Sequence, residues 1–200
     1  MTLKEMKAKT YSLIEEYYPD NANLAEDEDV LYKTNGIINQ IIMDLFRYRK
    51  VLSVEKISVR KKDDRVIDLL DELGNIYQLK KIRGTEYNIL TDYLIEVPED
   101  FEGDLTVYYY ALPKLCKTEF ETDKERQEED ESFKFDIDPV LLEIMPWGVG
   151  YNLLRLDMIS GNGSYFEKTY IEMIQKIDSR RTAGSIIVEG GIDVWITLEP

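Results

Sequence analysis

The residue types that most often perform catalysis are almost missing from this chain of 200 residues. It contains no histidine and a single cysteine, Cys116. A Ser-His-Asp or Cys-His triad, a histidine-ligated zinc ion and a histidine proton shuttle therefore cannot form within the chain. One thiol also cannot make an intramolecular disulfide or a CxxC redox pair, so nothing in the sequence indicates a secreted disulfide scaffold.

Pairs of carboxylates are the catalytic option that remains. A protonated acid beside an ionised partner can hydrolyse glycosidic bonds, and Asp136 with Asp138, or Asp63 with Asp64, offer such pairs. The chain holds 40 Asp and Glu residues, however, so close pairs arise by chance. Asp138 precedes Pro139, and this order is typical of a helix N-terminus. We predict that the protein is not an enzyme, and keep a carboxylate-based hydrolase as an alternative of another class.

Two ligand-binding patterns fail on their spacing. Asp20–Asp29 is rich in acids, but an EF-hand calcium loop needs a glycine at its sixth position, where this chain has Ala25. Gly148 and Gly150, like Asn162 and its flanking glycines, follow no strand and have no lysine after them, unlike a phosphate-binding loop. Helix junctions explain these glycines. We therefore expect no metal site and no cofactor.

Aromatic residues offer a different binding chemistry. Trp147, Trp195 and the tyrosines Tyr108–Tyr110 could stack on sugars or bases. Alternation along a strand sends Tyr109 to one face and its neighbours to the other, so at least one of these tyrosines belongs to the core. We favour core and subunit contacts for the aromatic residues, with Trp195 as one that docks into another chain.

Charge restricts the partners of the chain. The 25 Lys and Arg residues against 40 Asp and Glu residues give a formal net charge of -15 at pH 7. Such a chain repels the phosphate backbone of nucleic acid, and its basic stretches, Arg60–Lys62 and Lys80–Arg83, are short and flanked by acids. The sequence therefore argues against specific DNA binding. An acidic DNA mimic that inhibits a host factor is an alternative that would need one exposed strip of carboxylates.

Hydropathy indicates a soluble protein of the cell interior. With 44% hydrophobic residues, the chain can bury a conventional core. No apolar run approaches the roughly 20 residues that span a bilayer, so no membrane partner is expected. The segment Met1–Thr10 mixes three lysines with Glu5 and lacks the apolar part of a signal peptide.

Helical periodicity at both ends of the chain predicts four helices, at about 3–18, 26–49, 138–156 and 164–181. Thr2 and Glu5 have the Thr-x-x-Glu spacing of a capping box at the start of the first helix. Pro146, followed by Gly148 and Gly150, is expected to kink or interrupt the third helix.

Between these helices the hydrophobic period changes to two. Six antiparallel strands are predicted, at about 51–59, 66–70, 76–82, 87–90, 94–97 and 105–111. The stretch Glu119–Glu131 holds eight carboxylates and is interpreted as a solvated loop, with a cation site or a mimic of nucleic acid charge as alternatives.

These elements predict an α+β fold. We expect an α-helical bundle of two N-terminal and two C-terminal helices, with an inserted antiparallel β unit and an extended C-terminal arm, because helices from both ends bury their apolar stripes most economically against each other. The expected domains are the bundle at 1–50 and 136–181, the β domain at 51–118, the acidic loop at 119–135 and the arm at 182–200.

The C-terminal arm is the predicted docking site. Its Ile and Val runs, separated by Gly190 and Gly191, cannot fold alone and suit strand addition or groove docking on a partner. The residues expected to dock are Ile186, Ile187, Val188, Ile192, Val194 and Trp195.

The order of the parts is also informative. It is carried by Leu3–Tyr18, the Glu-Asp-Glu-Asp-Val run with Asn39 further along the same helix, Tyr108–Pro113, Asp136–Pro139, Met145–Leu154, and Phe166–Ile177 with its Tyr170. This order resembles the tailed-bacteriophage head-to-tail connector (adaptor) proteins, which form the ring beneath the portal. The resemblance covers residues 3–181 through diffuse hydrophobic patterns and carries no catalytic residue.

The resemblance implies a virion structural protein of the phage neck that assembles in the host cytoplasm. It implies a homo-oligomeric ring, commonly of twelve subunits, that contacts the portal protein on one side and a tail or tail-completion protein on the other. DNA would pass through without specific binding, which agrees with the excess of carboxylates. The β unit is larger than in the smallest connectors, which leaves open a longer adaptor subtype or another neck protein, such as a tail completion or tail terminator protein.

Overall fold

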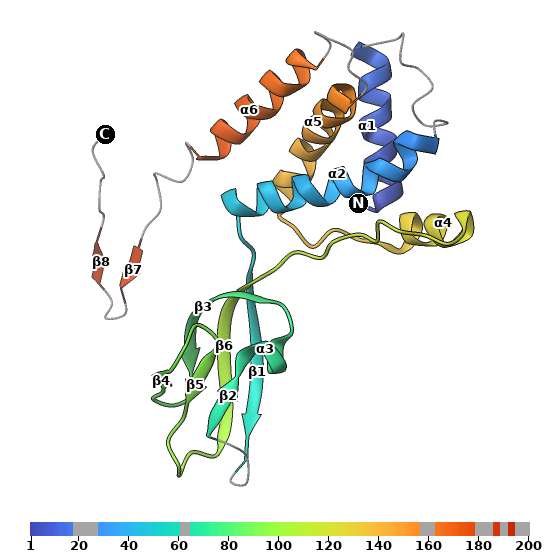
Figure 1. Ribbon diagram of the computed structural model, residues 1–200. Helices are drawn as coiled ribbons and strands as arrows, with labels where there is room; N and C mark the ends of the chain where they lie inside the picture. Colours follow the sequence, from blue (N-terminus) through green and yellow to red (C-terminus); the bar gives the residue numbers. More distant parts are fainter. Residues whose placement is uncertain (18–27, 61–64, 157–162, 179–185, 189–191, 195–200) are drawn as a thin grey trace. The chain divides into compact units, whose positions relative to one another are not determined.

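The computed structural model describes residues 1–17, 28–60, 65–156, 163–178, 186–188 and 192–194 (Figure 1). The fold is α+β, which confirms the predicted class. The chain divides into two compact units, Met1–Tyr48 with Leu115–Pro200, and Arg49–Lys114. We call them the helical unit and the β unit. The β unit is an insertion between two parts of the helical unit, and its bounds lie within four residues of the predicted 51–118.

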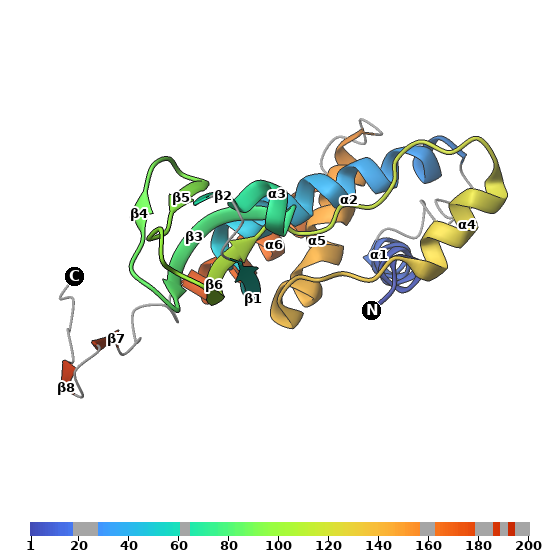
Figure 2. The same ribbon diagram turned by 90° about the horizontal axis from the view of Figure 1, so that it is seen from below.

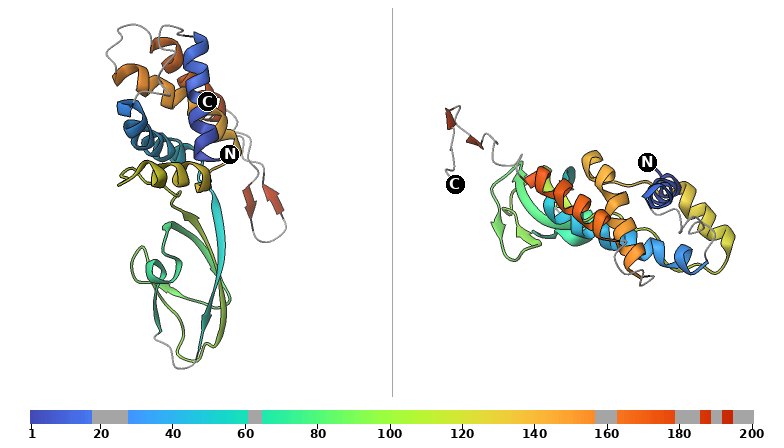
Figure 3. Two further views of the ribbon diagram at one scale, coloured as in Figure 1. Left: turned by 90° about the vertical axis from the view of Figure 1, so that its right-hand side faces the viewer. Right: turned by 90° about the horizontal axis from the view of Figure 1, so that it is seen from above.

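The helical unit is built around one apolar helix, α5 (Pro139–Leu156), which packs against three others (Figure 2; Figure 3). These are α1 (Leu3–Tyr17), α2 (Glu28–Tyr48) and α6 (Ser164–Asp178), so all four predicted helices are present. Fully buried side chains from each of the four helices form a single core: Leu3, Met6, Ile14, Ile38, Ile42, Leu45, Leu141, Met145, Val149 and Phe166.

Side-chain hydrogen bonds cap the N-termini of two of these helices at the residues that the sequence predicts. At α1 the Thr2 amide donates to Glu5 Oε2 at 2.8 Å, while the Glu5 amide donates to Thr2 Oγ1 at 3.2 Å, which is the expected capping box. At α5 the Val140 amide donates to Asp138 Oδ1 at 2.9 Å. Asp138 therefore caps a helix, as we expected for an Asp before Pro139.

Pro146 and its glycines were predicted to kink or interrupt the third helix, and the interruption is wrong, since α5 is continuous from Pro139 to Leu156. The two glycines lie inside the helix instead of at a junction. A Cβ atom at Gly148 would lie 2.7 Å from Cε2 of Tyr170, and one at Gly150 would lie 2.6 Å from Cε1 of Phe166. Real contacts of this kind are longer, so the missing side chains are what allow α6 to approach α5 this closely.

The acidic segment is not the solvated loop that we expected, because Asp123–Ser132 forms the helix α4. Thr122 caps it by accepting a hydrogen bond from the Glu125 amide at 3.3 Å. α4 buries none of its residues. It is tied to α1 by an ion pair in which Lys7 Nζ, on a side chain only 5% exposed, lies 2.7 Å from Asp130 Oδ1. Acidic residues in the first turn and a buried cation beside the last turns therefore stabilise a helix without an apolar stripe.

The β unit holds six antiparallel strands, as predicted, in two three-stranded sheets. The first sheet has the order β1-β6-β3 and the second β2-β5-β4. Their bounds are β1 Leu52–Val59, β2 Val66–Asp68, β3 Ile76–Arg83, β4 Asn88–Ile89, β5 Leu94–Glu96 and β6 Gly103–Ala111. The predicted strand at 66–70 is cut short: Asp68 Oδ1 accepts from the Leu70 amide at 2.8 Å and caps a short helix, α3 (Leu69–Leu73).

Successive side chains of the central strand β6 point to opposite faces of the first sheet. Tyr109 is 1% exposed and belongs to the core of the β unit, while Tyr108 and Tyr110 are half-buried on the other face. The expected alternation of the three tyrosines is confirmed. Tyr109 donates its hydroxyl hydrogen to Glu55 Oε1 at 2.7 Å, and burial, followed by this bond and the negative charge of Glu55, raises the pKa of Tyr109 to about 12.

Replacing Gly150 by alanine is expected to lower the free energy of unfolding of the helical unit by about 1–3 kcal/mol, because the new methyl group overlaps the buried ring of Phe166. Gly36, in the middle of α2, is the matched control, since a Cβ there meets nothing within 4 Å. Gly36→Ala should raise the same free energy by up to about 1 kcal/mol. Urea unfolding followed by circular dichroism at 222 nm measures both, and two shifts of the same sign would contradict the packing argument.

Candidate docking surfaces

The predicted docking residues form a hairpin. β7 (Ile186–Val188) pairs antiparallel with β8 (Ile192–Val194), with Ile186 opposite Val194 and Val188 opposite Ile192. Of the six residues predicted to dock, Ile186, Ile187, Val188, Ile192 and Val194 are brought together, and Trp195 lies outside the residues that the structure describes. The arm is thus not one extended segment, because its two apolar runs satisfy each other's backbone groups across the Gly190-Gly191 break.

The hairpin has the properties of a segment that is completed by a partner. Among the strands described, β7 and β8 pair only with each other. Two-stranded hairpins are marginally stable in water, and each strand keeps one edge whose backbone donors and acceptors can accept a further strand. This agrees with the strand addition that the sequence predicts for the arm.

An apolar groove lies on the helical unit between α5 and α6. Its volume is about 200 Å³, and its lining combines apolar side chains with one acid and one base: Val140, Ile144, Met173, Ile177, Glu143 and Lys176. The groove is large enough for one or two aliphatic side chains. Its shape and its apolar lining suit groove docking.

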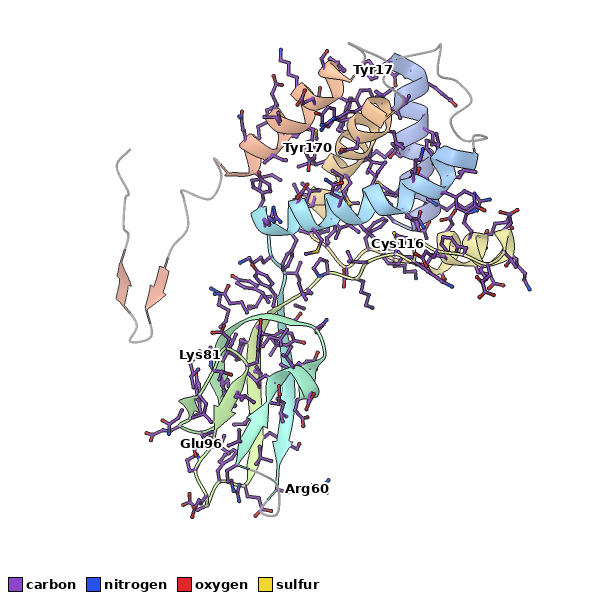
Figure 4. The ribbon with its side chains drawn as sticks, viewed as in Figure 1. Tyr17, Arg60, Lys81, Glu96, Cys116 and Tyr170 are labelled. Carbon is purple, nitrogen blue, oxygen red and sulfur yellow. The ribbon has the colours of Figure 1, made fainter. Side chains whose placement is uncertain are left out.

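Four aromatic rings gather where α1, α5 and α6 meet (Figure 4). Trp147 lies with its ring centre 5.0 Å from that of Phe166 and 5.8 Å from that of Tyr17. Phe166 is fully buried, whereas Tyr17 and Tyr165 are 41% and 46% exposed. Trp147 packs against the helical core, which agrees with the core interpretation of this tryptophan over a stacking site for sugars or bases.

Among the described residues, one cavity brings several carboxylates together and is a candidate for the carboxylate chemistry considered above. A cavity of about 580 Å³ in the β unit is lined by Glu86, Glu96 and Glu99 together with Tyr87 and Asn88. Asn88 Nδ2 donates to Glu96 Oε2 at 3.4 Å. Asp136 and Asp138 do not line this cavity, and Asp138 caps α5 instead, while Asp63 and Asp64 lie outside the residues described.

Cys116 is held in a buried polar clamp beside α2 (Figure 4). Its amide donates to Asn39 Oδ1 at 2.9 Å, and Asn39 Nδ2 donates to the Cys116 carbonyl at 2.8 Å. Burial raises the pKa of the Cys116 thiol to about 12, although the nearby Lys7 acts in the opposite direction. Because the thiolate is the reactive form, this cysteine stays an inert thiol near neutral pH. Its role is to join the chain after the β unit to α2 through Asn39.

One surface of the β unit was missed by the sequence reasoning. On the first sheet, Lys50 Nζ lies 4.6 Å from the ring centre of Tyr77, Lys80 Nζ lies 4.8 Å from that of Tyr110, and the guanidinium of Arg83 lies 5.2 Å from that of Tyr108. We call Lys50, Tyr77, Lys80, Arg83, Tyr108 and Tyr110 the cation–tyrosine face. The signal was present: a basic run, Lys80–Arg83, falls in a strand whose neighbour carries three tyrosines.

Over residues 1–17, 28–60, 65–156, 163–178, 186–188 and 192–194, no group of three or more Cys, Asp or Glu side chains is placed to hold a metal ion. No helix in these ranges has the length and apolar character required to cross a membrane. Comparison of the chain with protein-family models and with curated proteins finds no match. Function is therefore argued from the fold and the surfaces described above.

The raised pKa of Cys116 predicts a pH dependence of stability. A thiol that ionises near pH 9 when unfolded and near 12 when folded binds more protons in the folded state over that interval. Its contribution is complete below pH 9 and is lost as the pH rises toward 12, by at most about 1.4 kcal/mol per pH unit. Wild type should therefore lose stability faster than Cys116→Ala between pH 8.5 and 10.5 in urea titrations. Parallel curves for the two proteins would contradict this account.

Proposed function

We propose that this protein is a virion structural protein, a head-to-tail connector that forms a ring between the portal and the tail of a tailed bacteriophage. The observation that carries the proposal is the construction of the helical unit. Helices from both ends of the chain, α1 and α2 with α5 and α6, pack as one body around α5, and the β unit is inserted between them. This is the order of parts in which the sequence resembles the connector proteins.

The distribution of charge supports the same role. The helical unit holds 27 Asp and Glu residues against 14 Lys and Arg residues, whereas the β unit holds 13 against 11. A ring whose channel is lined by the helical unit would repel the phosphate backbone and let DNA pass without binding.

The C-terminal hairpin supports the docking part of the proposal. β7 and β8 pair with no other described strand, so their outer edges can extend a sheet of the portal or of a neighbouring subunit. A tail completion or tail terminator protein of the phage neck is the alternative, since such a protein would use the same helical body and the same exposed edges. The two differ in which component of the neck is bound.

The proposal predicts that the chain is present in mature particles of its phage in a copy number near that of the portal protein. Quantitative mass spectrometry of purified particles, with the portal and major capsid proteins as internal standards, measures this number. Absence from mature particles would overturn the structural role and favour the inhibitor or the hydrolase, the latter to be tested by Glu96→Gln in the cavity of the β unit.

A second prediction concerns the arm. Deleting residues 182–200 should leave the helical unit folded, because the core residues of that unit precede residue 178. Portal binding should be lost, because the hairpin is removed. Affinity capture with purified portal protein and with tail-completion protein as separate baits measures binding, and circular dichroism confirms folding. Undiminished portal capture by the shortened chain would contradict the docking role of the arm, and capture by the tail protein alone would favour the alternative neck protein.

A further inference from the structure

The cation–tyrosine face is built by two irregularities in strand β3. The register of β3 against β6 shifts between Ile76 and Gln78 and again between Leu79 and Lys81, so that Tyr77 and Lys80 have no partner residue opposite them. Lys50 lies over the rings of both Tyr77 and Tyr110, at 4.6 and 5.5 Å, and Lys80 lies over that of Tyr110. Both inserted residues thus reach the outer face, where regular pairing would have placed fewer side chains.

Aliphatic side chains border this face. Leu52 and Val54 of β1 stand opposite Tyr110 and Tyr108 in register and are 52% and 51% exposed. Tyrosine and arginine are enriched in protein interfaces, whereas lysine is depleted there, and the exposed aliphatic neighbours add apolar area to the face. A nucleic acid backbone would neutralise the cations but leave Leu52 and Val54 in water. The observations therefore favour a protein partner with an anionic surface.

The chain itself supplies such a surface. α4 holds six carboxylates in ten residues, buries none of them in the core of the helical unit and exposes the side chains of Glu128 and Glu131 by 66% each. The cations of the face lie on the unit whose charge is nearly balanced, whereas α4 belongs to the unit that carries most of the negative charge. We propose that the cation–tyrosine face binds α4 of a second copy of this chain.

The geometry of such a contact has a consequence for assembly. The contact joins two different surfaces, and every copy carries one of each. When two copies bind, the pair still has an unoccupied cation–tyrosine face on one copy and an unoccupied α4 on the other, so further copies can be added. Contacts of this heterologous type extend head to tail, and they close into a ring when the rotation between copies permits it and form an open filament when it does not, whereas a contact of like surfaces stops at a two-fold dimer. The inference deepens the proposed connector function and rests on it for ring closure, but the contact can be tested with the purified chain.

The first test reverses two cations of the face, with Lys80→Glu and Arg83→Glu combined. Both residues are exposed, so the β unit should keep its circular dichroism spectrum. Self-association, measured by sedimentation velocity at low ionic strength, should weaken at least about tenfold. Lys9→Glu combined with Lys168→Glu is the matched control, because it changes the net charge equally on exposed positions of α1 and α6. This control should associate as strongly as wild type.

The second test exchanges the charges between the two surfaces. Glu128→Lys combined with Glu131→Lys on α4 should also weaken self-association. Neither residue belongs to the helical core, but Glu131 forms an ion pair with Lys4 of α1 at 3.0 Å, so circular dichroism must show that the variant stays folded. Mixing this variant with the Lys80→Glu, Arg83→Glu variant should restore assembly, since the reversed face of one chain meets the reversed α4 of the other. Recovery in the mixture is a result that a mere folding defect in either variant cannot produce.

Several outcomes would overturn the inference. These are a wild-type chain that stays monomeric up to about 100 µM, unchanged association of the face variant, and a mixture that does not recover. Binding of a DNA duplex by wild type that is lost in the face variant would assign the face to nucleic acid and overturn it too. None of these results removes the chain from phage particles, so the connector function is judged separately by its copy number there.

Discussion

The helical unit depends on the close approach of α6 to α5 at Gly148 and Gly150. Where a side chain would stand on α5, the rings of Tyr170 and Phe166 occupy the space instead, and a Cβ at either glycine would overlap them. Because α5 also packs against α1 and α2, this close approach allows all three other helices to pack against one apolar helix. A unit assembled from two distant parts of the chain needs such a centre, since neither part buries its apolar residues alone.

A second set of contacts joins the chain to α2, one of the helices that pack against α5. The carbonyl and amide of Cys116 bond to the side chain of Asn39 on α2, and Asn35 Nδ2 donates to the Lys117 carbonyl at 2.7 Å. Two amide side chains, one helical turn apart, thus fix two successive residues, Cys116 and Lys117, just after the inserted β unit. The amide of Asn39 uses both its oxygen and its nitrogen, and a buried amide satisfied in this way specifies one path for the backbone more strictly than apolar packing does. The helical unit tolerates the insertion because hydrogen bonds to α2 fix the backbone directly after the β unit.

Features with a local physical cause could be predicted from the sequence. Thr2 with Glu5, Asp138 before Pro139, and the alternation around Tyr109 depend on neighbours within a few residues, and the structure confirms each. α4 was missed because it lacks the apolar period by which helices are recognised, and its stability comes from Lys7, far away in sequence. The Thr122-x-x-Glu125 spacing was the local sign of that helix. Gly148 and Gly150 were interpreted wrongly because the rings that leave no room for a side chain there belong to α6. Only the folded chain brings α6 next to α5.

The separation of charge between the two units constrains how copies of the chain can meet. Two helical units, each with 27 acids against 14 bases, repel each other. A dimer of like helical surfaces is therefore disfavoured unless the burial of apolar area outweighs this repulsion. Cations placed over tyrosine rings on the other unit offer the complementary surface. Repulsion between like surfaces and attraction between unlike ones act in the same direction, because both select head-to-tail contacts. In the proposed contact, charge patterning of this kind specifies the direction of assembly, although the sequence patterns that define the fold say nothing about a partner.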